Sequence, residues 1–440
     1  MATVKVRIQH HNVSSTLLTE TSPADDWRAC GGDVFASLQS CIQKIEGRDL
    51  CESLACNLNR LLGLAQNAIR SVHHSKVDRK WRRLYTDICI LKGVMAMTES
   101  AGIYHQTAVL DAIRDLDMAI IICGAPGLDR LEMIYAEIAS LQREVTTPVQ
   151  SPSKPANARN NMQSKSQEPS ACCLASASVK ETPSAPSLSD YLSRSHAEPF
   201  IVRNFASSWP AIQDEKHNWA NGSYLSQIGG LGRVVPVEIG WQYTEADWYQ
   251  DVIPWQDFLE AIGWNTTTTT TTNEADDKKK PQYLAQHNLF RQFPALELDI
   301  IVPDIVYSCP PAPAFFLQYR PPVDEDGLET SIVNAWIGPK GTTTPVHFDP
   351  YYNAYVQVVG QKLIWIAPPD IFNSEDGSLL DGNSSTLPVF DRDAPDTEQS
   401  KRINEQAMTA VLGPGDLLIL PPGWFHAMRS LSRVRLASMM

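Results

Sequence analysis

Three side chains near one end of the chain have the types and spacing of metal ligands. His347 and Asp349 stand two apart in "PVHFDP", and His426 follows the apolar run "LLILPPGWF". Residues two apart on an extended chain point to the same side, so His347 and Asp349 can face one interior. Two imidazoles and a carboxylate on one face of a metal are typical of non-haem Fe(II) oxygenases, which keep three positions for co-substrate and oxygen. Carboxylate and imidazole also suit Zn or Mn, so the ligand types leave the metal open.

The spacing of the first pair is weak evidence by itself. With 10 His and 50 acidic residues in 440 positions, a His two residues before an acid is expected about once by chance. The pair His196 and Glu198 has the same spacing before Pro199, and we interpret it as surface. The alternative for His347, Asp349 and His426 is three polar residues that cap strands. His426 also lies next to a predicted strand, and this third possible ligand favours the metal site.

One cation lies on the next predicted strand. Lys362 in "YVQVVGQKLIWIAP" is the only charged residue between Asp349 and Asp370. A buried keto acid such as 2-oxoglutarate requires a cation and hydroxyl or amide donors for its distal carboxylate. The alternative for a strand lysine is a solvated outer face or an edge guard. Its isolation in an apolar run favours the buried role, and the candidate donors beside it are Thr344, Asn353 and Tyr283.

The elements that must position these residues are short strands. After residue 187 the chain carries runs rich in Val, Ile and aromatic residues between Pro and Gly, with helices predicted in "IPWQDFLEAIG" and "QHNLFRQFPAL". Many short strands at this spacing predict a β-sandwich or jelly-roll barrel. The predicted strands are "PFIVRNF", "VVPVEIG", "AFFLQY", "IVNAWIG", "AYVQVV", "KLIWIAP" and "DLLILPP".

Changes in composition divide the chain into parts. Residues 1–146 contain five segments with apolar residues at spacings of three and four, which predict a helical bundle or short solenoid. Residues 147–187 are rich in Pro, Ser, Lys and Gln and predict a disordered linker. The barrel is then expected over 188–440, with surface inserts at 265–280 and 373–402.

Composition excludes some classes of function. A formal net charge of −13 disfavours sequence-blind binding to nucleic acid or anionic membranes. The nine Cys show no C-x-x-C spacing, and no window approaches the roughly 20 apolar residues that a membrane span needs. We therefore expect a soluble protein with reduced thiols, in the nucleus or cytoplasm or both.

The segments that carry these motifs resemble the JmjC domains of the cupin superfamily. The resemblance lies in "NAWIGPKGTTTPVHFDPYYNAYVQVVGQKLIWIAPP" and "LGPGDLLILPPGWFHAMRSL", and it extends to segments of the helical region such as "RKWRRLYTDICILKG". It implies an α+β fold, with an all-α domain before a double-stranded β-helix of the jelly-roll, cupin-like type. It also implies that His347, Asp349 and His426 bind Fe(II), while Lys362, Tyr283, Thr344 and Asn353 hold 2-oxoglutarate with Trp336 against it.

The activity that the resemblance implies is oxidation of a protein side chain. Oxygen and 2-oxoglutarate give succinate, carbon dioxide and an oxidant that removes hydrogen from a substrate C–H bond. The implied partner is a protein or histone tail, with no sequence-specific binding to nucleic acid. Protein hydroxylation, of an arginyl or another peptidyl position, ranks above demethylation of histone methyl-lysine, because a methylated ammonium requires extra room beside the iron. Glu238, Tyr243 and Trp248 are candidates for binding a cationic side chain; the alternative is a strand followed by a packed helix start.

The last residues depart from the family pattern. "RSLSRVRLASMM" places Arg433 and Arg435 where apolar residues are expected and lacks the family's terminal tryptophans. We expect an altered or mis-spliced end, which puts a complete barrel wall and full activity in question. Two alternatives to an active oxygenase follow: a catalytically impaired scaffold or chromatin-interaction protein, and a metal-binding cupin of another chemistry.

Overall fold

The computed structural model describes residues 27–98, 103–145, 175–193, 197–264, 280–324, 329–372, 379–380, 383–390, 397–432 and 434–439. They form two compact units, one of which contains the N-terminal helices together with Gly230–Val235. The other contains the strands that carry the predicted ligands. The predicted α+β class, a helical region followed by a β-rich cupin region, is confirmed. Residues 146–174 and 265–279, on which most of the predicted linker and the first insert fall, lie outside the described residues.

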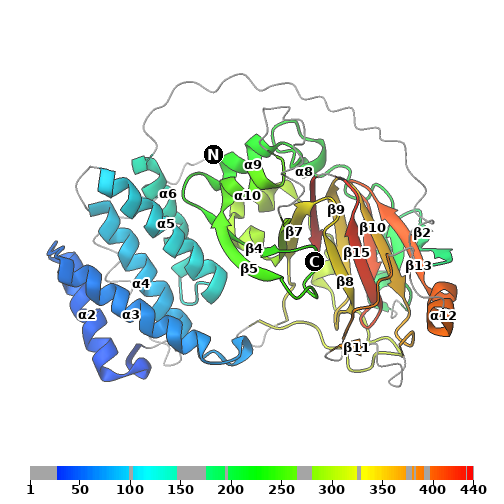
Figure 1. The fold of residues 1–440 in the computed structure, drawn as a ribbon, viewed down its shortest axis with the longest axis horizontal. Helices are drawn as coiled ribbons and strands as arrows, with labels where there is room; N and C mark the ends of the chain where they lie inside the picture. Colours follow the sequence, from blue (N-terminus) through cyan, green and yellow to red (C-terminus); the bar gives the residue numbers. More distant parts are fainter. Residues whose placement is uncertain are drawn as a thin grey trace. The chain divides into compact units, whose positions relative to one another are not determined.

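In the described part of the helical unit, five α-helices follow one another along the chain, and each packs against the next (Figure 1). Each of the five segments with helical periodicity forms one of them, and their apolar faces share one core that includes Leu58, Ile88 and Ile134. The helices are α2 Gly32–Glu46, α3 Glu52–Arg70, α4 Arg79–Thr98, α5 Ile103–Cys123 and α6 Arg130–Val145, with short 3₁₀ helices η1 Trp27–Cys30 and η2 His74–Lys76.

A buried carboxylate ties three of these elements together. Asp87 on α4 accepts hydrogen bonds from Trp27 Nε1 (2.8 Å), Arg83 Nε (2.6 Å) and Arg130 Nε (3.0 Å). A fully buried carboxylate is tolerated only when such partners replace its hydration. The turn before α6 depends on the same cluster, because Gly127 has φ +112° and a Cβ there would collide with the Arg83 guanidinium.

The β-rich unit is built from two sheets. In the described residues one sheet has the order β1-β13-β10-β15-β8-β12-β11 and the other β2-β3-β14-β9-β16-β7-β6-β4-β5. Figure 1 shows β8, β15, β10 and β13 side by side in the first sheet. Its strands are β1 Ala177–Ser178, β8 Thr343–Phe348, β10 Lys362–Ala367, β11 Leu379–Leu380, β12 Ser384–Ser385, β13 Met408–Leu412 and β15 Phe425–Ser430. Those of the second are β2 Lys180–Thr182, β3 Phe200–Val202, β4 Val234–Ile239, β5 Tyr249–Pro254, β6 Gln282–His287, β7 Asn334–Pro339, β9 Asn353–Val359, β14 Leu417–Leu420 and β16 Val434–Met439.

Apolar cores lie on both faces of the first sheet. Successive side chains of β10 point alternately into one core and into the other. Ile364 and Ile366 pack with Leu418 and Tyr355 of the second sheet, so this face is the interior of the barrel. Trp365 and its neighbours of the same parity pack outside. The remaining helices are α7 Leu188–Ser193, α8 Pro210–Gln213, α9 Gly222–Gly229, α10 Trp255–Ala261, α11 Leu289–Gln292 and α12 Glu398–Gln406, with 3₁₀ helices η5 Pro294–Asp299 and η6 Asp304–Tyr307.

Two of the predicted loop segments contain regular structure. The end of the predicted linker forms β1 and β2, which pair in parallel with β13 and β3. The predicted insert 373–402 contains β12, which pairs with β8, and the start of α12. Val389 and Phe390 from this insert are buried in the outer core, so the segment covers the sheet. The composition of these segments did not predict their regular structure, because a few apolar residues are enough to anchor a mainly polar segment.

One predicted strand is wrong. "AFFLQY" forms turns, because prolines on both sides of it at 310, 311, 313, 321 and 322 lack the backbone N–H that a sheet ladder needs. Phe315 and Leu317 are consequently exposed.

The residues at 434–439, where the sequence puts a complete barrel wall in question, form a strand that is paired on both sides. β16 lies between β7 and β9, with Trp336 opposite Ala437 and Val356 opposite Ser438. Arg435 is opposite Gly338 in the same ladder, so this arginine does not prevent pairing of the strand, whereas Arg433 lies outside the described residues.

Glu137 on α6 is a buried acid in the helical core. It is 8% exposed, its Oε1 has no hydrogen-bond partner among the described residues, and burial raises its pKa from 4.5 to about 7. Because the folded state binds this proton more tightly than the unfolded chain, its contribution to stability is fully present below pH 4.5. That contribution is lost as the pH rises to about 7.

The substitution Glu137→Gln is expected to remove this pH dependence. Relative to the parent, the free energy of unfolding of the variant should rise by about 2–3 kcal/mol between pH 4.5 and 7 and then stay level. Chemical denaturation followed by circular dichroism across this range measures the difference. Glu132→Gln, at an exposed position of the same helix, should give a pH-independent difference. Equal curves for parent and Glu137→Gln would contradict the assignment.

Candidate metal centre

The pairing of β8 with β15 places the predicted ligands next to each other. His347 lies directly opposite His426, and Phe348 opposite Phe425. Beyond this point the register shifts, because two residues of β8, Pro345 and Val346, correspond to the single residue Ala427. The extra residue changes the alternation of side chains on β8. Thr344 therefore lies opposite Met428 on the interior face, although it is three residues from His347.

The three predicted ligands converge on one point. One nitrogen or oxygen from each of His347, Asp349 and His426 lies within 4.8 Å of the others. The Nε2 atoms of His347 and His426 are 3.9 Å and 3.6 Å from the nearer oxygen of Asp349, and the imidazole centroids are 4.3 Å apart. The other pair with this spacing falls partly outside the described residues, at His196.

The backbone fixes the orientation of both imidazoles. His347 Nδ1 lies 2.9 Å from the carbonyl of Pro345, and His426 Nδ1 lies 3.2 Å from that of Trp424. A ring N–H donated to a carbonyl puts the lone pair on Nε2, which in both residues is the nitrogen that faces Asp349. Burial, with a contribution from His347, lowers the pKa of His426 to about 4. The imidazole is thus neutral and able to ligate at physiological pH.

Asn353 supports the carboxylate. Its Nδ2 donates to Asp349 Oδ2 at 2.7 Å, and the Gly423 backbone N–H donates to the Asp349 carbonyl at 2.9 Å. Asn353 was a predicted donor to 2-oxoglutarate. In the structure its amide contacts the predicted metal ligand, where it orients one oxygen and leaves the other toward His347.

Lys362 lies on the interior side of β10. It is 4% exposed, shares the parity of Ile364 and Ile366, and stands opposite Ser430. Its Nζ donates to the Tyr283 hydroxyl at 3.3 Å and lies 5.5 Å from the centre of the Tyr355 ring. The alternative of a solvated lysine is therefore wrong.

Tyr283 rests on the neighbouring strand β7. Its ring fills the space that a side chain at Gly338 would occupy, so a larger residue there would displace it. Trp336, two residues earlier on β7, is half-buried and shares this face of the strand. Of the five residues predicted to hold 2-oxoglutarate, Tyr283 and Trp336 therefore lie on the adjoining strands β6 and β7 of the second sheet. Thr344 and Lys362 lie on β8 and β10, the two strands that flank β15 in the first sheet.

The three candidate substrate-binding residues also lie together. Trp248 Nε1 donates to Glu238 Oε2 at 3.4 Å, and Glu238 is opposite Tyr283 in the ladder of β4 and β6. Burial raises the pKa of Glu238. Burial also raises the pKa of Tyr243, and the nearby carboxylates of Glu238 and Asp349 act in the same direction. Tyr243 is therefore close both to Glu238 and to the metal ligands.

Some residues of the site were not predicted from the sequence. Ser384 on β12 stands opposite His347 and hydrogen-bonds the Tyr243 side chain. Thr342 Oγ1 donates to Ser430 Oγ at 3.0 Å next to Lys362. The spacing of two between His426, Met428 and Ser430 could have indicated that Ser430 shares the interior face with His426. Nothing in the sequence around Ser384 indicates that it belongs to the site.

The donor set fits a divalent first-row metal and an anionic co-substrate. Two imidazoles and a carboxylate match Fe(II), with Zn and Mn as chemical alternatives. A buried ammonium with phenol and hydroxyl neighbours fits a carboxylate, which would offset the desolvation of the lysine. The residues present thus fit both groups that the site requires.

A jelly-roll barrel with a His-Asp-His cluster between its sheets defines the class of metal-binding cupins. A family model described as "Cupin-like domain" matches residues 188–440, which is more than half of the chain. The chain belongs to this cupin-like, JmjC-type family, whose enzymes are Fe(II)- and 2-oxoglutarate-dependent dioxygenases.

Curated relatives agree with this assignment. The chain is 31% identical over 364 residues to lysine-specific demethylase 8 of Danio rerio, covering 81% of this chain and 79% of the relative. It is 32% identical over 251 residues to Jumonji C domain-containing protein 5 of Drosophila melanogaster, covering 56% of this chain and 55% of that protein. It is also 32% identical over 238 residues to a lysine-specific demethylase of Arabidopsis thaliana, covering 53% of this chain and 47% of that protein. The match thus spans about half the length of the last two relatives and most of the first.

No helix in the described part of the chain has the length and apolar character needed to cross a membrane.

The substitution Asn353→Ala is expected to weaken metal binding about 10- to 100-fold, because it frees the Asp349 carboxylate to rotate. Titration of the metal-free protein with Mn(II) by calorimetry measures the affinity. Asn288→Ala, at an exposed helix cap away from the site, should leave it unchanged. Equal Mn(II) affinity in the parent and Asn353→Ala would show that Asn353 does not orient a ligand.

Proposed function

We propose that the chain is an Fe(II)- and 2-oxoglutarate-dependent oxygenase that acts on protein side chains. The observation that carries the proposal is the convergence of His347, Asp349 and His426 within 4.8 Å, in a barrel that also buries Lys362. The family supports the chemistry, and its relatives include proteins named as lysine-specific demethylases.

Each part of the site has a defined task in this proposal. His347, Asp349 and His426 would hold the metal, and the carbonyls of Pro345 and Trp424 keep the two imidazoles in the ligating orientation. With iron, 2-oxoglutarate and oxygen bound, the site would supply an oxidant for a C–H bond while 2-oxoglutarate becomes succinate and carbon dioxide. Lys362 would pair with the distal carboxylate of 2-oxoglutarate, and the Tyr283 hydroxyl holds the ammonium in position.

The class of substrate is inferred from Glu238, Tyr243 and Trp248. Glu238 offers a carboxylate, and Trp248 and Tyr243 offer aromatic surface, which together suit a guanidinium or ammonium group. The Glu238 carboxyl has a raised pKa because it is buried, and a cationic substrate would restore the ionised form. We propose hydroxylation of an arginyl side chain in preference to demethylation of methyl-lysine on a histone tail. A nuclear or cytoplasmic location is part of the same proposal.

The first test is turnover. With Fe(II) and oxygen, the protein should convert 2-oxoglutarate to succinate, and His347→Ala should abolish this because it removes one of three ligands. Succinate is quantified by NMR, and His73→Ala, at an exposed position of the helical unit, is the matched control.

The mass of treated arginine and methyl-lysine peptides then identifies the reaction. Gain of one oxygen indicates hydroxylation, whereas loss of a methyl group indicates demethylation. No turnover together with tight Zn binding and no affinity for 2-oxoglutarate would contradict the proposal and favour a cupin of another chemistry.

The second test concerns the co-substrate. Lys362→Met is expected to raise the KM for 2-oxoglutarate about 10- to 100-fold, since a buried charge-assisted hydrogen bond contributes about 1.5–3 kcal/mol. Steady-state succinate formation measures KM, and Mn(II) affinity shows that the variant is folded. Lys401→Met, at the exposed Lys401–Glu398 pair, should have no effect. An unchanged KM in Lys362→Met would remove the assigned role of this lysine.

A further inference from the structure

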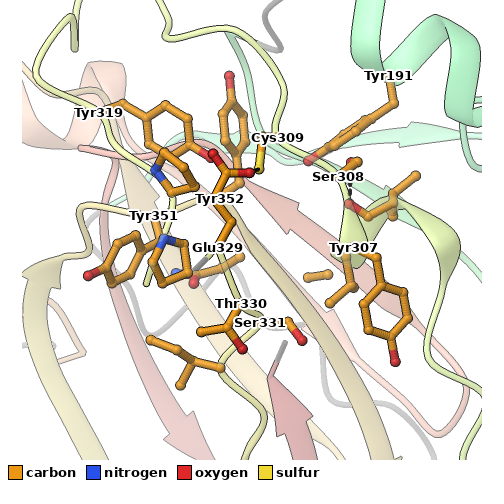
Figure 2. A pocket seen from close by; sticks show the side chains of 17 residues that line it. Tyr191, Tyr307, Ser308, Cys309, Tyr319, Glu329, Thr330, Ser331, Tyr351 and Tyr352 are labelled. Atoms are coloured by element: carbon orange, nitrogen blue, oxygen red, sulfur yellow. Dashed lines mark hydrogen bonds between the residues drawn. The ribbon is translucent and has the colours of Figure 1, made fainter. Parts of the chain in front are cut away.

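A second cavity lies beside the metal centre in the β-rich unit. It has a volume of about 260 Å³ and is lined by side chains of α7, of residues 305–309, 319, 321, 322 and 329–332, and of residues 351–354 (Figure 2). Five tyrosines contribute to its wall: Tyr191, Tyr307, Tyr319, Tyr351 and Tyr352. None of these residues was assigned a role in the metal or co-substrate sites.

The aromatic wall is ordered by ring contacts. Tyr352 packs edge-on against Tyr319 at 5.2 Å and against Tyr191 at 6.1 Å between centroids, and its hydroxyl donates to the Pro311 carbonyl at 3.0 Å. Burial raises the pKa of Tyr319 to about 12 and that of Tyr191 further. The phenols are therefore neutral, and their rings attract a cation without competing charge.

One carboxylate enters this aromatic wall. Glu329 Oε2 accepts a hydrogen bond from Cys309 Sγ at 3.1 Å, and Figure 2 shows the side chain directed toward Cys309. Partial desolvation and the neighbouring Glu329 carboxylate raise the pKa of the exposed Cys309 to about 11, so the sulfur is a protonated donor that orients the carboxylate. A carboxylate beside tyrosine rings is a combination that suits an ammonium or a guanidinium.

The segment that lines the cavity, residues 304–324 and 329–332, carries exposed apolar side chains, here called the rim; of these, Tyr307 and Ile332 line the cavity itself. Tyr307 and Leu317 are each 69% exposed, and Phe315, Val323 and Ile332 on the same segment are also exposed. Clustered exposed apolar side chains mark surfaces that bind other proteins. The segment that forms this rim is the one whose prolines prevent the strand predicted in "AFFLQY".

The charge of the segment favours a basic partner. Among its described residues, Asp304, Asp324 and Glu329 are acidic and only Arg320 is basic. The Arg320 guanidinium donates to the carbonyls of Leu317 and Tyr319, so it is held along its own backbone. The chain as a whole has a net charge of −13.

The cavity is adjacent to the metal ligands. Asn353 lines it and also donates to Asp349. Phe316, from the rim segment, contacts Phe348 at 6.0 Å between centroids and closes over Gly423, where a Cβ would meet its ring. The segment that contributes Tyr307, Tyr319 and Glu329 to the cavity therefore also packs beside the residue that follows His347.

We propose that this cavity is a docking site for the protein substrate, separate from the position of the oxidised residue. It takes a lysine or arginine side chain from a neighbouring part of the substrate, and the exposed apolar rim contacts the residues that flank it. The inference rests on the proposed function in one respect, namely that the occupant is the substrate. Binding of a basic peptide can be measured without turnover.

The test uses a fluorescein-labelled peptide with the sequence of the histone H3 tail and metal-free full-length protein. Fluorescence anisotropy should give a Kd that Glu329→Gln and Tyr307→Ser each weaken about 3- to 10-fold, the range of a cation–aromatic or exposed charge contact. A peptide with citrulline for arginine and acetyl-lysine for lysine should bind more weakly to the parent and lose its sensitivity to Glu329→Gln.

Matched controls are available elsewhere in the chain. Glu398→Gln removes an exposed carboxylate on α12, and Leu128→Ser removes an apolar side chain that is 72% exposed in the helical unit. Both should leave the Kd unchanged. Circular dichroism and Mn(II) affinity show that each variant is folded.

The outcomes separate this inference from the proposed function. Unchanged Kd in both cavity variants would overturn the docking site even if the protein produces succinate. A concentration-dependent dimer in sedimentation that Tyr307→Ser abolishes would also overturn it and assign the face to a second copy of the chain. Kd values that respond as expected while His347→Ala and the parent both fail to form succinate would support a basic-peptide site and reject the oxygenase.

Discussion

The antiparallel pairing of β8 with β15 is the constraint on which the metal site depends. It places His347 opposite His426, and the backbone carbonyls two residues before each histidine fix the two rings. The register shift that follows brings Thr344 to the interior, which a regular strand would turn outward. A ladder of backbone hydrogen bonds thus holds side chains that would otherwise sample many rotamers, and little reorganisation remains when a metal binds.

Part of the barrel interior is polar, at a cost in stability. Lys362, the Thr342–Ser430 pair and the Tyr355–Gln357 pair all lie where an apolar core would be simpler to pack. Each is satisfied locally; the Tyr355 hydroxyl donates to Gln357, whose amide donates to the Val359 carbonyl. Such networks are stable only when every member has its partner. The outer face of the first sheet is apolar and is covered by Val389, Phe390 and Ile403, and the burial of these side chains offsets this cost.

Features that depend on residues close together in the sequence could be predicted. Features that depend on which strands are neighbours in space could not. Helical periodicity located α2–α6, and the isolation of Lys362 in an apolar run indicated its burial. Residues two apart could be placed on one face, which brought His347 and Asp349 together. The role of Asn353 could not be distinguished from that of a co-substrate donor, because both use the same amide. Ser384 and the apolar anchors of the segment around Phe390 could not be found, since they depend on which strand lies beside β8 in space.

The position of β16 has a consequence for the order of assembly. It is the latest described strand along the chain, yet it lies in the middle of its sheet, between β7 and β9. Before β16 is inserted, the second sheet is divided into two halves, and β7 and β9 each present an unpaired edge to solvent. The nascent barrel is therefore exposed to wrong pairing until most of the chain has been synthesised, and its closure requires contacts of high sequence separation. The latest described strand along the chain is thus the one that joins the two halves of its sheet.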